Sequence, residues 1–153
     1  VNRLNRETLL TVAVENAIYV NLRKRVNLSF FNNLDDLSTF DNLVFDTSHF
    51  AISHNDIFTA WERLRPRVKH IHLSNNYLKG FDDHELPHQG NLPLDRFLAR
   101  IASDGYDGIV TLELNPGSLG AKISRAEVVT RLAASLEFCR NHFSSGLPGP
   151  GTA

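Results

Sequence analysis

Four short apolar runs, rich in β-branched residues, each end on a side chain that can bind a metal ion. The runs are 11–15, 43–46, 68–72 and 109–113, and their last residues are Glu15, Asp46, His72 and Glu113. Stretches with helical character separate the runs, and this alternation predicts βα units and a parallel sheet. Because all strands of a parallel sheet end at the same edge, we expect the four side chains to converge on one point.

Three carboxylates do not gather at one point unpaired, because like charges repel and raise one another's pKa. A divalent cation resolves that conflict. Three carboxylates and one imidazole form a mostly hard ligand set, which suits Mn²⁺, Mg²⁺ or Co²⁺, with Zn²⁺ as an alternative. The pattern therefore predicts that Glu15, Asp46, His72 and Glu113 bind one divalent metal ion.

The composition indicates one domain without a general bias toward nucleic acid or membranes. The chain has 153 residues, a formal net charge of −1 and 42% hydrophobic residues, which is enough for a real core. No apolar run approaches the roughly 20 residues needed to cross a bilayer, and the start shows no signal-peptide pattern. We interpret the single cysteine, Cys139, as a small core residue rather than a nucleophile. We expect a cytoplasmic protein.

Alternation within the runs predicts part of a barrel. If Glu15 and Glu113 point into a barrel, every second residue before them in the run also points in. The residues between these inward positions point outward and are aliphatic, as packing against outer helices requires. Four βα units are half of a (β/α)8 TIM barrel, an α/β fold of about 250 residues. The chain has no methionine and begins at Val1. We interpret residues 1–143 as the C-terminal half, strands five to eight, followed by a Gly/Pro/Ser-rich disordered tail at 144–153.

The segments between the runs carry ordinary helix and loop signals. We expect helices at 34–40, at 56–64 after an Asn55 cap, from Pro93 to about Ser103, and from a Ser124 cap to about Phe143. Residues 74–91 form a long polar loop, and such loops are often functional. The basic stretch 23–25 is more typical of a solvated loop than of a phosphate contact.

Four motifs at these strand ends resemble the second half of the xylose-isomerase-like barrel superfamily, which includes sugar phosphate isomerases, ketose epimerases and type-four apurinic endonucleases. The motifs are Val14-Glu15-Asn16, Asp46-Thr47-Ser48-His49, His70-Ile71-His72-Leu73-Ser74-Asn75 and Gly105-Tyr106-Asp107-Gly108-Ile109-Val110-Thr111-Leu112-Glu113-Leu114-Asn115-Pro116. Each motif is weak alone, but the ordered set is specific. The resemblance covers about residues 8–140.

The resemblance implies a role for each matching residue. The metal ligands on strands five to eight would be Glu15, Asp46, His72 and Glu113. Glu15 and Glu113 would also be catalytic acid/base groups on opposite faces of a small sugar or sugar phosphate. They would move a proton next to a carbonyl through a metal-stabilised enediolate. His49 and His84 would contact the substrate.

The loop at 82–90 resembles a D-x-H…G-x-G segment of the superfamily but departs from it. His88 stands in place of the first glycine and Gln89 in place of the acidic residue that follows. The arginine that ketose epimerases place after the seventh-strand histidine has no counterpart here, because Lys79 is out of register. No particular ketose specificity is predicted.

Two other classes remain open. An apurinic-endonuclease-like multi-zinc phosphodiesterase would use Asp46, His49, His72, Asp82, His84 and Glu113 on DNA. It needs further histidines from the first half of a barrel and a basic surface, so nucleic acid is not the favoured partner. The other class is a non-catalytic half-barrel. A half-barrel alone is not expected to be active, and its open sheet edges could drive homo-oligomer formation.

Overall fold

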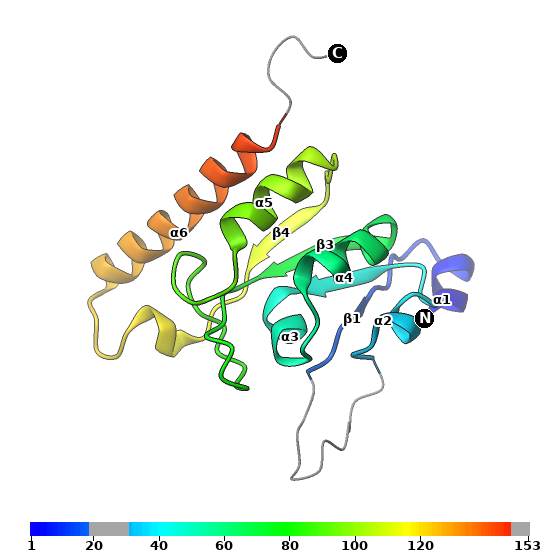
Figure 1. Ribbon diagram of the computed structural model, residues 1–153, viewed down its shortest axis with the longest axis horizontal. Coiled ribbons are helices and arrows are strands. Elements are labelled where there is room, and N and C mark those ends of the chain that lie inside the picture. Colours follow the sequence, from blue (N-terminus) through cyan, green and yellow to red (C-terminus); the bar gives the residue numbers. More distant parts are fainter. Residues whose placement is uncertain (19–30, 148–153) are drawn as a thin grey trace.

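The computed structural model describes residues 1–18 and 31–147 (Figure 1). The basic stretch 23–25 and the tail residues 148–153 lie outside these described residues. In chain order the elements are α1 (Asn2–Glu7), β1 (Val14–Glu15), α2 (Leu34–Leu37), β2 (Leu43–Asp46), α3 (Thr47–Ile52), α4 (Ile57–Leu64), the 3-10 turn η1 (Arg65–Arg67), β3 (Val68–Leu73), α5 (Leu94–Ser103), β4 (Ile109–Leu112), the 3-10 turn η2 (Pro116–Leu119) and α6 (Arg125–Ser145).

The strands form one four-stranded sheet in the order β1-β2-β3-β4, and every neighbouring pair is parallel. Asp46 lies opposite His72, and His72 lies opposite Thr111. All four strands therefore end at the same edge of the sheet, although β1 pairs in a staggered register, with Glu15 opposite Val44 (Figure 1). The prediction of a parallel α/β sheet, with strands in the sequential order of a barrel wall, is confirmed.

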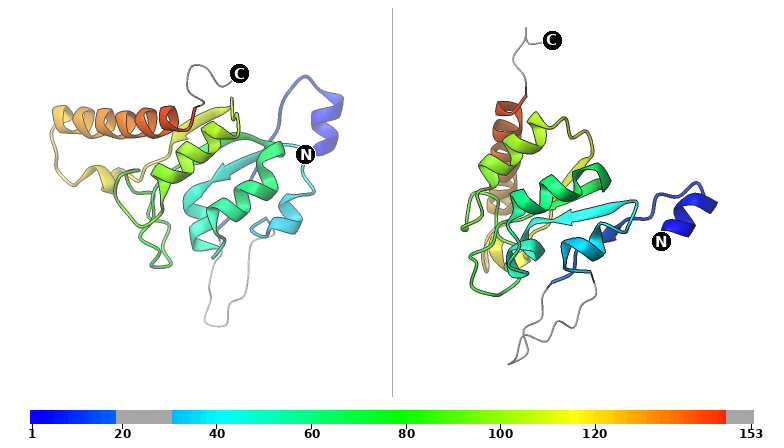
Figure 2. Two further views of the ribbon diagram at one scale, coloured as in Figure 1. Left: turned by 45° about the horizontal axis from the view of Figure 1, so that its top comes forward. Right: turned by 45° about the vertical axis from the view of Figure 1, so that its right-hand side comes forward.

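Helices cover one face of the sheet, as Figure 2 shows for α4 and α5. Phe45 points to this side, where its ring stacks on Phe97 of α5 with centroids 5.5 Å apart and meets Trp61 of α4 edge-on at 5.9 Å. Ile71 is buried in the same core. The opposite face is open: Ile109, at the start of β4, is 66% exposed. The predicted alternation therefore separates a face that packs against helices from one that the described residues leave uncovered at Ile109.

The first strand is shorter than predicted. Residues 11–15 were expected to be extended and paired, but β1 contains only Val14 and Glu15. Asn5 explains the difference, because its side chain holds the backbone of Val12: Nδ2 donates to Val12 O at 2.8 Å, and Oδ1 accepts from Val12 N at 2.6 Å. The groups of Val12 that would extend the ladder are already bonded to α1.

The helices differ from prediction mainly at their starts and ends. Helix α3 was not expected; it begins directly after β2, with the Asp46 carboxylate as its N-cap. Helix α4 is capped by Asp56, which accepts from Thr59 N, rather than by Asn55. Helix α6 starts at the predicted Ser124 cap but continues to Ser145, two residues into the segment 144–153 that was predicted to be disordered.

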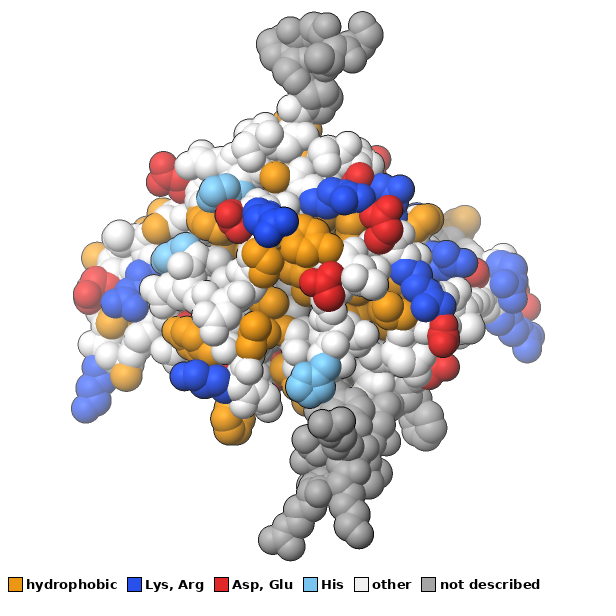
Figure 3. All heavy atoms as spheres, viewed as in Figure 1, with side chains coloured by type: hydrophobic (Ala, Val, Ile, Leu, Met, Phe, Trp, Pro, Cys, Tyr) orange, Lys and Arg blue, Asp and Glu red, His pale blue; other side chains and the backbone are white. Residues whose placement is uncertain are grey.

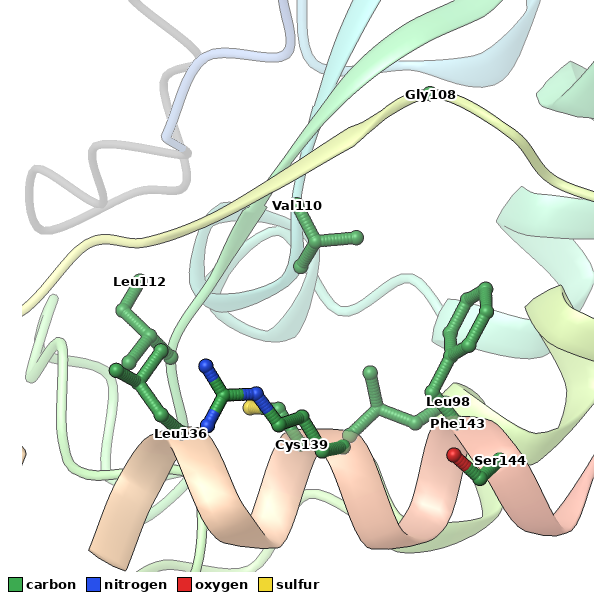
Figure 4. A pocket seen from close by; sticks show the side chains of 9 residues that line it. Leu98, Gly108, Val110, Leu112, Leu136, Cys139, Phe143 and Ser144 are labelled. Carbon is green, nitrogen blue, oxygen red and sulfur yellow. The ribbon is translucent and has the colours of Figure 1, made fainter. Parts of the chain in front are cut away.

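An apolar cavity of about 340 Å³ separates β4 from α6. Figure 4 shows Val110 and Leu112 of β4 on one side, with Leu136 and Cys139 of α6 across from them. Cys139 packs against the core, as predicted, and burial raises the pKa of its thiol to about 11. The thiol is therefore neutral at physiological pH. Within residues 1–18 and 31–147, no helix combines the length and apolar character that crossing a bilayer requires.

A polar cluster holds the buried indole of α4 in place. Trp61, the only tryptophan, is 2% exposed and donates from Nε1 to Asp104 Oδ2 at 2.8 Å. The same carboxylate accepts from Arg100 Nε at 2.8 Å and lies 3.0 Å from Arg65. Asp104 thus joins α4, η1 and α5 at the amino-terminal side of the sheet.

We expect Asp104→Ala to lower the free energy of unfolding by about 1–3 kcal/mol, because the buried indole N–H would lose its acceptor. Urea unfolding followed by Trp61 fluorescence measures this change. Asp107→Ala removes an exposed carboxylate close by and should stay within about 0.5 kcal/mol of the wild type. Equal losses in the two variants would contradict the assignment.

Candidate metal centre

The structure brings together the four side chains at the strand ends. Glu15, Asp46, His72 and Glu113 each offer one ligand atom, and these atoms all lie within 4.8 Å of one another. Glu15 ends β1, Asp46 ends β2 and His72 lies in β3, while Glu113 directly follows β4. The predicted convergence therefore follows from the parallel ladder.

His72 is central to the cluster. Its Nδ1 lies 2.5 Å from Glu113 Oε2, 3.5 Å from Glu15 Oε1 and 3.9 Å from Asp46 Oδ2. The three carboxylates thus face one imidazole nitrogen from three other strand ends. This is the mostly hard set of oxygen and nitrogen donors that a divalent ion such as Mn²⁺ or Zn²⁺ takes.

Three buried atoms of this cluster form no hydrogen bond of good geometry within the described part of the chain, although two of them lie at ion-pair distance from each other. They are Asp46 Oδ2, His72 Nδ1 and Glu113 Oε2. Buried polar atoms are nearly always satisfied, so a group without a partner calls for an explanation such as an ion. All three atoms lie on the side chains that converge, and a cation among them would satisfy all three at once. The residues present therefore fit a divalent metal.

Asp46 divides its two carboxylate oxygens between structure and site. Oδ1 accepts from the backbone N–H of His49 at 2.7 Å and so caps α3, while Oδ2 is left to face the cluster. The side chain is fully buried, and this burial raises its pKa to about 6. The hydrogen bond from His49 instead holds the pKa of Glu15 below its usual range. Glu15 therefore stays ionised more readily than Asp46.

His49 links the cluster to the loop after β3. Its Nδ1 lies 2.8 Å from Asn16 O and 3.2 Å from Glu15 Oε1, and its Nε2 lies 3.3 Å from Asp82 Oδ2. Burial disfavours the charged ring, but the hydrogen bonds to Asp82 and Glu15 outweigh burial and raise the pKa of His49 to about 11. The protonated ring neutralises part of the negative charge that gathers here.

A second group of possible ligands lies beside the first. Asp46, His49 and His84 also offer ligand atoms within 4.8 Å of one another. His84 Nε2 lies 3.0 Å from Asp82 Oδ1, and this hydrogen bond raises the pKa of His84 to about 9 against the opposing effect of burial. Burial likewise raises the pKa of Asp82, but the hydrogen bonds from His49 and His84 dominate and hold it well below its usual range. Asp82 thus lies between two protonated rings.

Buried hydroxyl and amide groups hold these elements in register. Ser48 Oγ donates to Asp82 Oδ1 at 2.9 Å and accepts from Asn76 Nδ2 at 2.9 Å. Thr47 Oγ1 donates to Ser74 O at 2.7 Å and accepts from Ser74 N at 3.1 Å. Helix α3 is therefore bonded both to the end of β3 and to the loop that carries Asp82.

Sequence reasoning placed His49 and His84 near a substrate, and the structure places both rings beside the cluster, 5.5 Å apart by their centroids. The sequence alone offered no reason to assign roles to Asn16, Thr47, Ser48 and Asn76. Each of the four stands in or next to a motif that contains a proposed ligand, and that position was the available signal. Their hydrogen bonds to other segments could not be read from the sequence.

Comparison with known proteins identifies the fold family. Residues 31–142 match the family described as xylose isomerase-like TIM barrel. The chain belongs to this family. Its four βα units are therefore a portion of a (β/α) barrel, as the strand order indicated.

Several curated proteins resemble parts of this xylose isomerase-like chain. An uncharacterised protein of Mycobacterium tuberculosis (strain ATCC 25618 / H37Rv) is 31% identical over 97 residues, which are 63% of this chain and 34% of that protein. A putative hydroxypyruvate isomerase of Streptomyces coelicolor is 32% identical over 72 residues, 47% of this chain and 24% of that protein. The matched segments thus span about a third or less of these relatives.

A solved structure shares the fold. The crystal structure of a D-tagatose 3-epimerase-like protein superposes with a TM-score of 0.60 and 19% sequence identity. The match covers 91% of this chain and 51% of the other. At this identity the likeness concerns the fold alone.

We expect the metal-free protein to lose stability between about pH 6.5 and pH 9. An unfolded histidine has a pKa of about 6.5, whereas that of folded His84 is raised to about 9. Its stabilising contribution is therefore fully present below pH 6.5 and is lost as the pH rises through 9. His49, with a folded pKa of about 11, adds a loss in the same direction that continues above pH 9. Urea unfolding in the presence of a chelator measures the free energy at both ends of this range.

Two variants check the cause of that pH dependence. Asp82→Asn removes the carboxylate between the two rings and should flatten the decline. His54→Gln alters an exposed histidine and should leave the decline as in the wild type. A decline of the same size in Asp82→Asn would show that another group is responsible.

Proposed function

We propose that Glu15, Asp46, His72 and Glu113 hold one divalent metal ion, and that the enzyme built around them is an isomerase or epimerase of small sugars or sugar phosphates. The observation that carries this proposal is the position of the two glutamates. They reach the same imidazole nitrogen from β1 and β4, the two outermost strands of the sheet. Two carboxylates on opposite sides of one centre suit transfer of a proton between two faces of a substrate.

The exposure of the carboxylates separates their roles. The side chain of Asp46 is fully buried, whereas Glu15 is 37% exposed and Glu113 is 42% exposed. A buried carboxylate can hold an ion but cannot reach a substrate. We therefore assign Asp46 and His72 to metal binding, and Glu15 and Glu113 to metal binding and proton transfer.

Proton transfer would take place at the carbon next to a carbonyl. When bound, the metal ion would polarise a carbonyl or hydroxyl oxygen of the substrate. Glu15 or Glu113, as the carboxylate, would take the proton from the adjacent carbon, which leaves an enediolate. The other glutamate, in its protonated form, would invert the carbon by returning a proton to the opposite face. A proton returned instead to the former carbonyl carbon would isomerise the sugar, with a second proton moving from the neighbouring hydroxyl oxygen to the former carbonyl oxygen. His49, which keeps the pKa of Glu15 low, would keep that residue ready to accept a proton.

We further propose that residues 1–143 are the second half of an eight-stranded barrel, and that four more strands complete the substrate pocket. The open edges of β1 and β4 and the exposed inner face at Ile109 support this arrangement. The match to 51% of the epimerase-like structure agrees with it. Names of an isomerase and of an epimerase-like protein among the similar proteins favour the same reaction class.

One observation favours a second candidate, a multi-zinc phosphodiesterase of the apurinic endonuclease kind. Asp46, His49 and His84 form a second group of possible ligands beside the first. Binding to DNA, however, draws on a positive surface. The face in Figure 3 instead shows basic and acidic side chains interspersed, and the net charge is −1. The isomerase therefore remains our proposal.

Metal binding is the first prediction of the proposed function. Mn²⁺ should raise the melting temperature of the complete barrel, because a ligand that binds the native state stabilises it. Glu113→Gln should remove most of that gain. Glu127→Gln, on the first turn of α6, is the matched control and should keep the gain. A metal response that is unchanged in Glu113→Gln would refute the ligand assignment.

Proton exchange is the second prediction. With Mn²⁺ and a substrate in deuterated water, deuterium should enter the carbon next to the carbonyl, as mass spectrometry or NMR would detect. Glu15→Gln and Glu113→Gln should each lower turnover by about 10²-fold or more, because each loses a proton carrier. Cleavage of abasic DNA, with no turnover across a panel of ketoses and aldoses, would decide for the phosphodiesterase.

A further inference from the structure

A buried asparagine forms the last link between β1 and β2. Asn16 is 1% exposed, and its side-chain amide bonds to one residue twice: Nδ2 donates to Asp46 O at 3.0 Å, and Oδ1 accepts from Asp46 N at 2.8 Å. Its own backbone carbonyl lies 2.8 Å from His49 Nδ1. Asn16 therefore contacts Asp46 of the cluster and His49 beside it, and it directly follows Glu15.

The side chain takes the place of a missing stretch of strand. The backbone ladder between β1 and β2 ends where Glu15 pairs with Val44. The chain then turns away, since Ala17 N donates to Phe31 O rather than to β2. On the β1 side Asp46 thus has no strand partner among the described residues, and its buried N–H would be costly to leave unpaired. Its C=O also faces this side, although as the N-cap it serves the first turn of α3 as well. A side-chain amide has an acceptor oxygen and a donor nitrogen side by side. It can therefore bond to the N–H and the C=O of Asp46 at the same time.

We infer that Asn16 is a positioning residue of the metal centre: its amide fixes the separation between the carboxylates of Glu15 and Asp46. The inference rests on the proposed metal centre. Asn16 is covalently joined to Glu15 and makes two hydrogen bonds to the backbone of Asp46. A movement of its amide therefore moves one ligand relative to the other. Ligand groups act on an ion only at defined distances, and loss of an outer hydrogen bond typically lowers metal affinity 10–100-fold.

The chain contains a matched control for this arrangement. Asn5 makes the same pair of hydrogen bonds to one residue, from Nδ2 to Val12 O at 2.8 Å and from Val12 N to Oδ1 at 2.6 Å. Asn5 contributes no atom to either group of possible ligands. Replacing Asn5 removes the same pair of hydrogen bonds from the segment that precedes β1 without touching the cluster.

The test measures Mn²⁺ affinity and thermal stability in the full-length protein. The variants are Asn16→Ala, Asn16→Ser and Asn5→Ala, with the dissociation constant of Mn²⁺ taken from electron paramagnetic resonance or calorimetry. We expect Asn16→Ala to weaken Mn²⁺ binding about tenfold or more. Asn5→Ala should lower the melting temperature of the metal-free protein about as much as Asn16→Ala does. It should leave the dissociation constant of Mn²⁺ within about twofold of the wild type. If Asn16→Ala does not fold, Asn16→Ser decides, because a hydroxyl can still satisfy one of the two backbone groups.

The outcomes separate this inference from the function on which it rests. Wild-type protein that binds no Mn²⁺ would overturn both the proposed metal centre and the role of Asn16. Tight binding by the wild type and equally tight binding by a folded Asn16 variant would overturn the role of Asn16 alone. Equal weakening in Asn5→Ala and Asn16→Ala would also overturn it, since the effect would then follow general stability.

Discussion

The surrounding structure depends on the carboxylate of Asp46, which is buried at the end of a central strand. Taking an ionised carboxylate out of water is costly unless it is hydrogen-bonded or paired, and here burial raises its pKa to about 6. The neighbouring residues reduce that cost: the first turn of α3 donates to one oxygen, and the protonated His49 supplies positive charge nearby. The other oxygen is left for the cluster. The capped helix and the possible metal site thus depend on the same side chain.

The two groups of possible ligands share Asp46 and are connected through His49. His49 contacts Glu15 on one side and Asp82 on the other. A shift of the loop that carries Asp82 would therefore move the imidazole ring of His49, and with it the hydrogen bond to Glu15. Ser48 strengthens this connection, because its hydroxyl joins Asp82 to Asn76 within the same loop. The loop after β3 and the strand ends behave as one bonded unit.

The sequence was most informative where a periodic pattern continues through a whole element. The runs at 43–46 and 109–113 locate β2 and β4 to within a residue, since their apolar positions pack against helices. The cluster was predictable for the same reason: parallel strands bring their ends together. Side-chain hydrogen bonds to the backbone left no such pattern. Asn5 shortens β1, and Asp46 starts α3, through contacts that depend on where the chain folds back.

The link made by Asn16 has a consequence for how such a site can change over time. A rung of backbone hydrogen bonds can be altered only by inserting or deleting residues, which shifts the facing of every side chain that follows. Where a side chain supplies these hydrogen bonds, a single amino-acid substitution changes the length and the polarity of the link between the strands. The spacing between the first two strand ends is then open to gradual adjustment, while the sheet below it stays in register. Thr47, the first residue of α3, bonds in the same manner to the backbone of Ser74, just beyond β3. The spacing between the ends of β2 and β3 has the same freedom, so the geometry at the strand ends can vary independently of the fold that supports it.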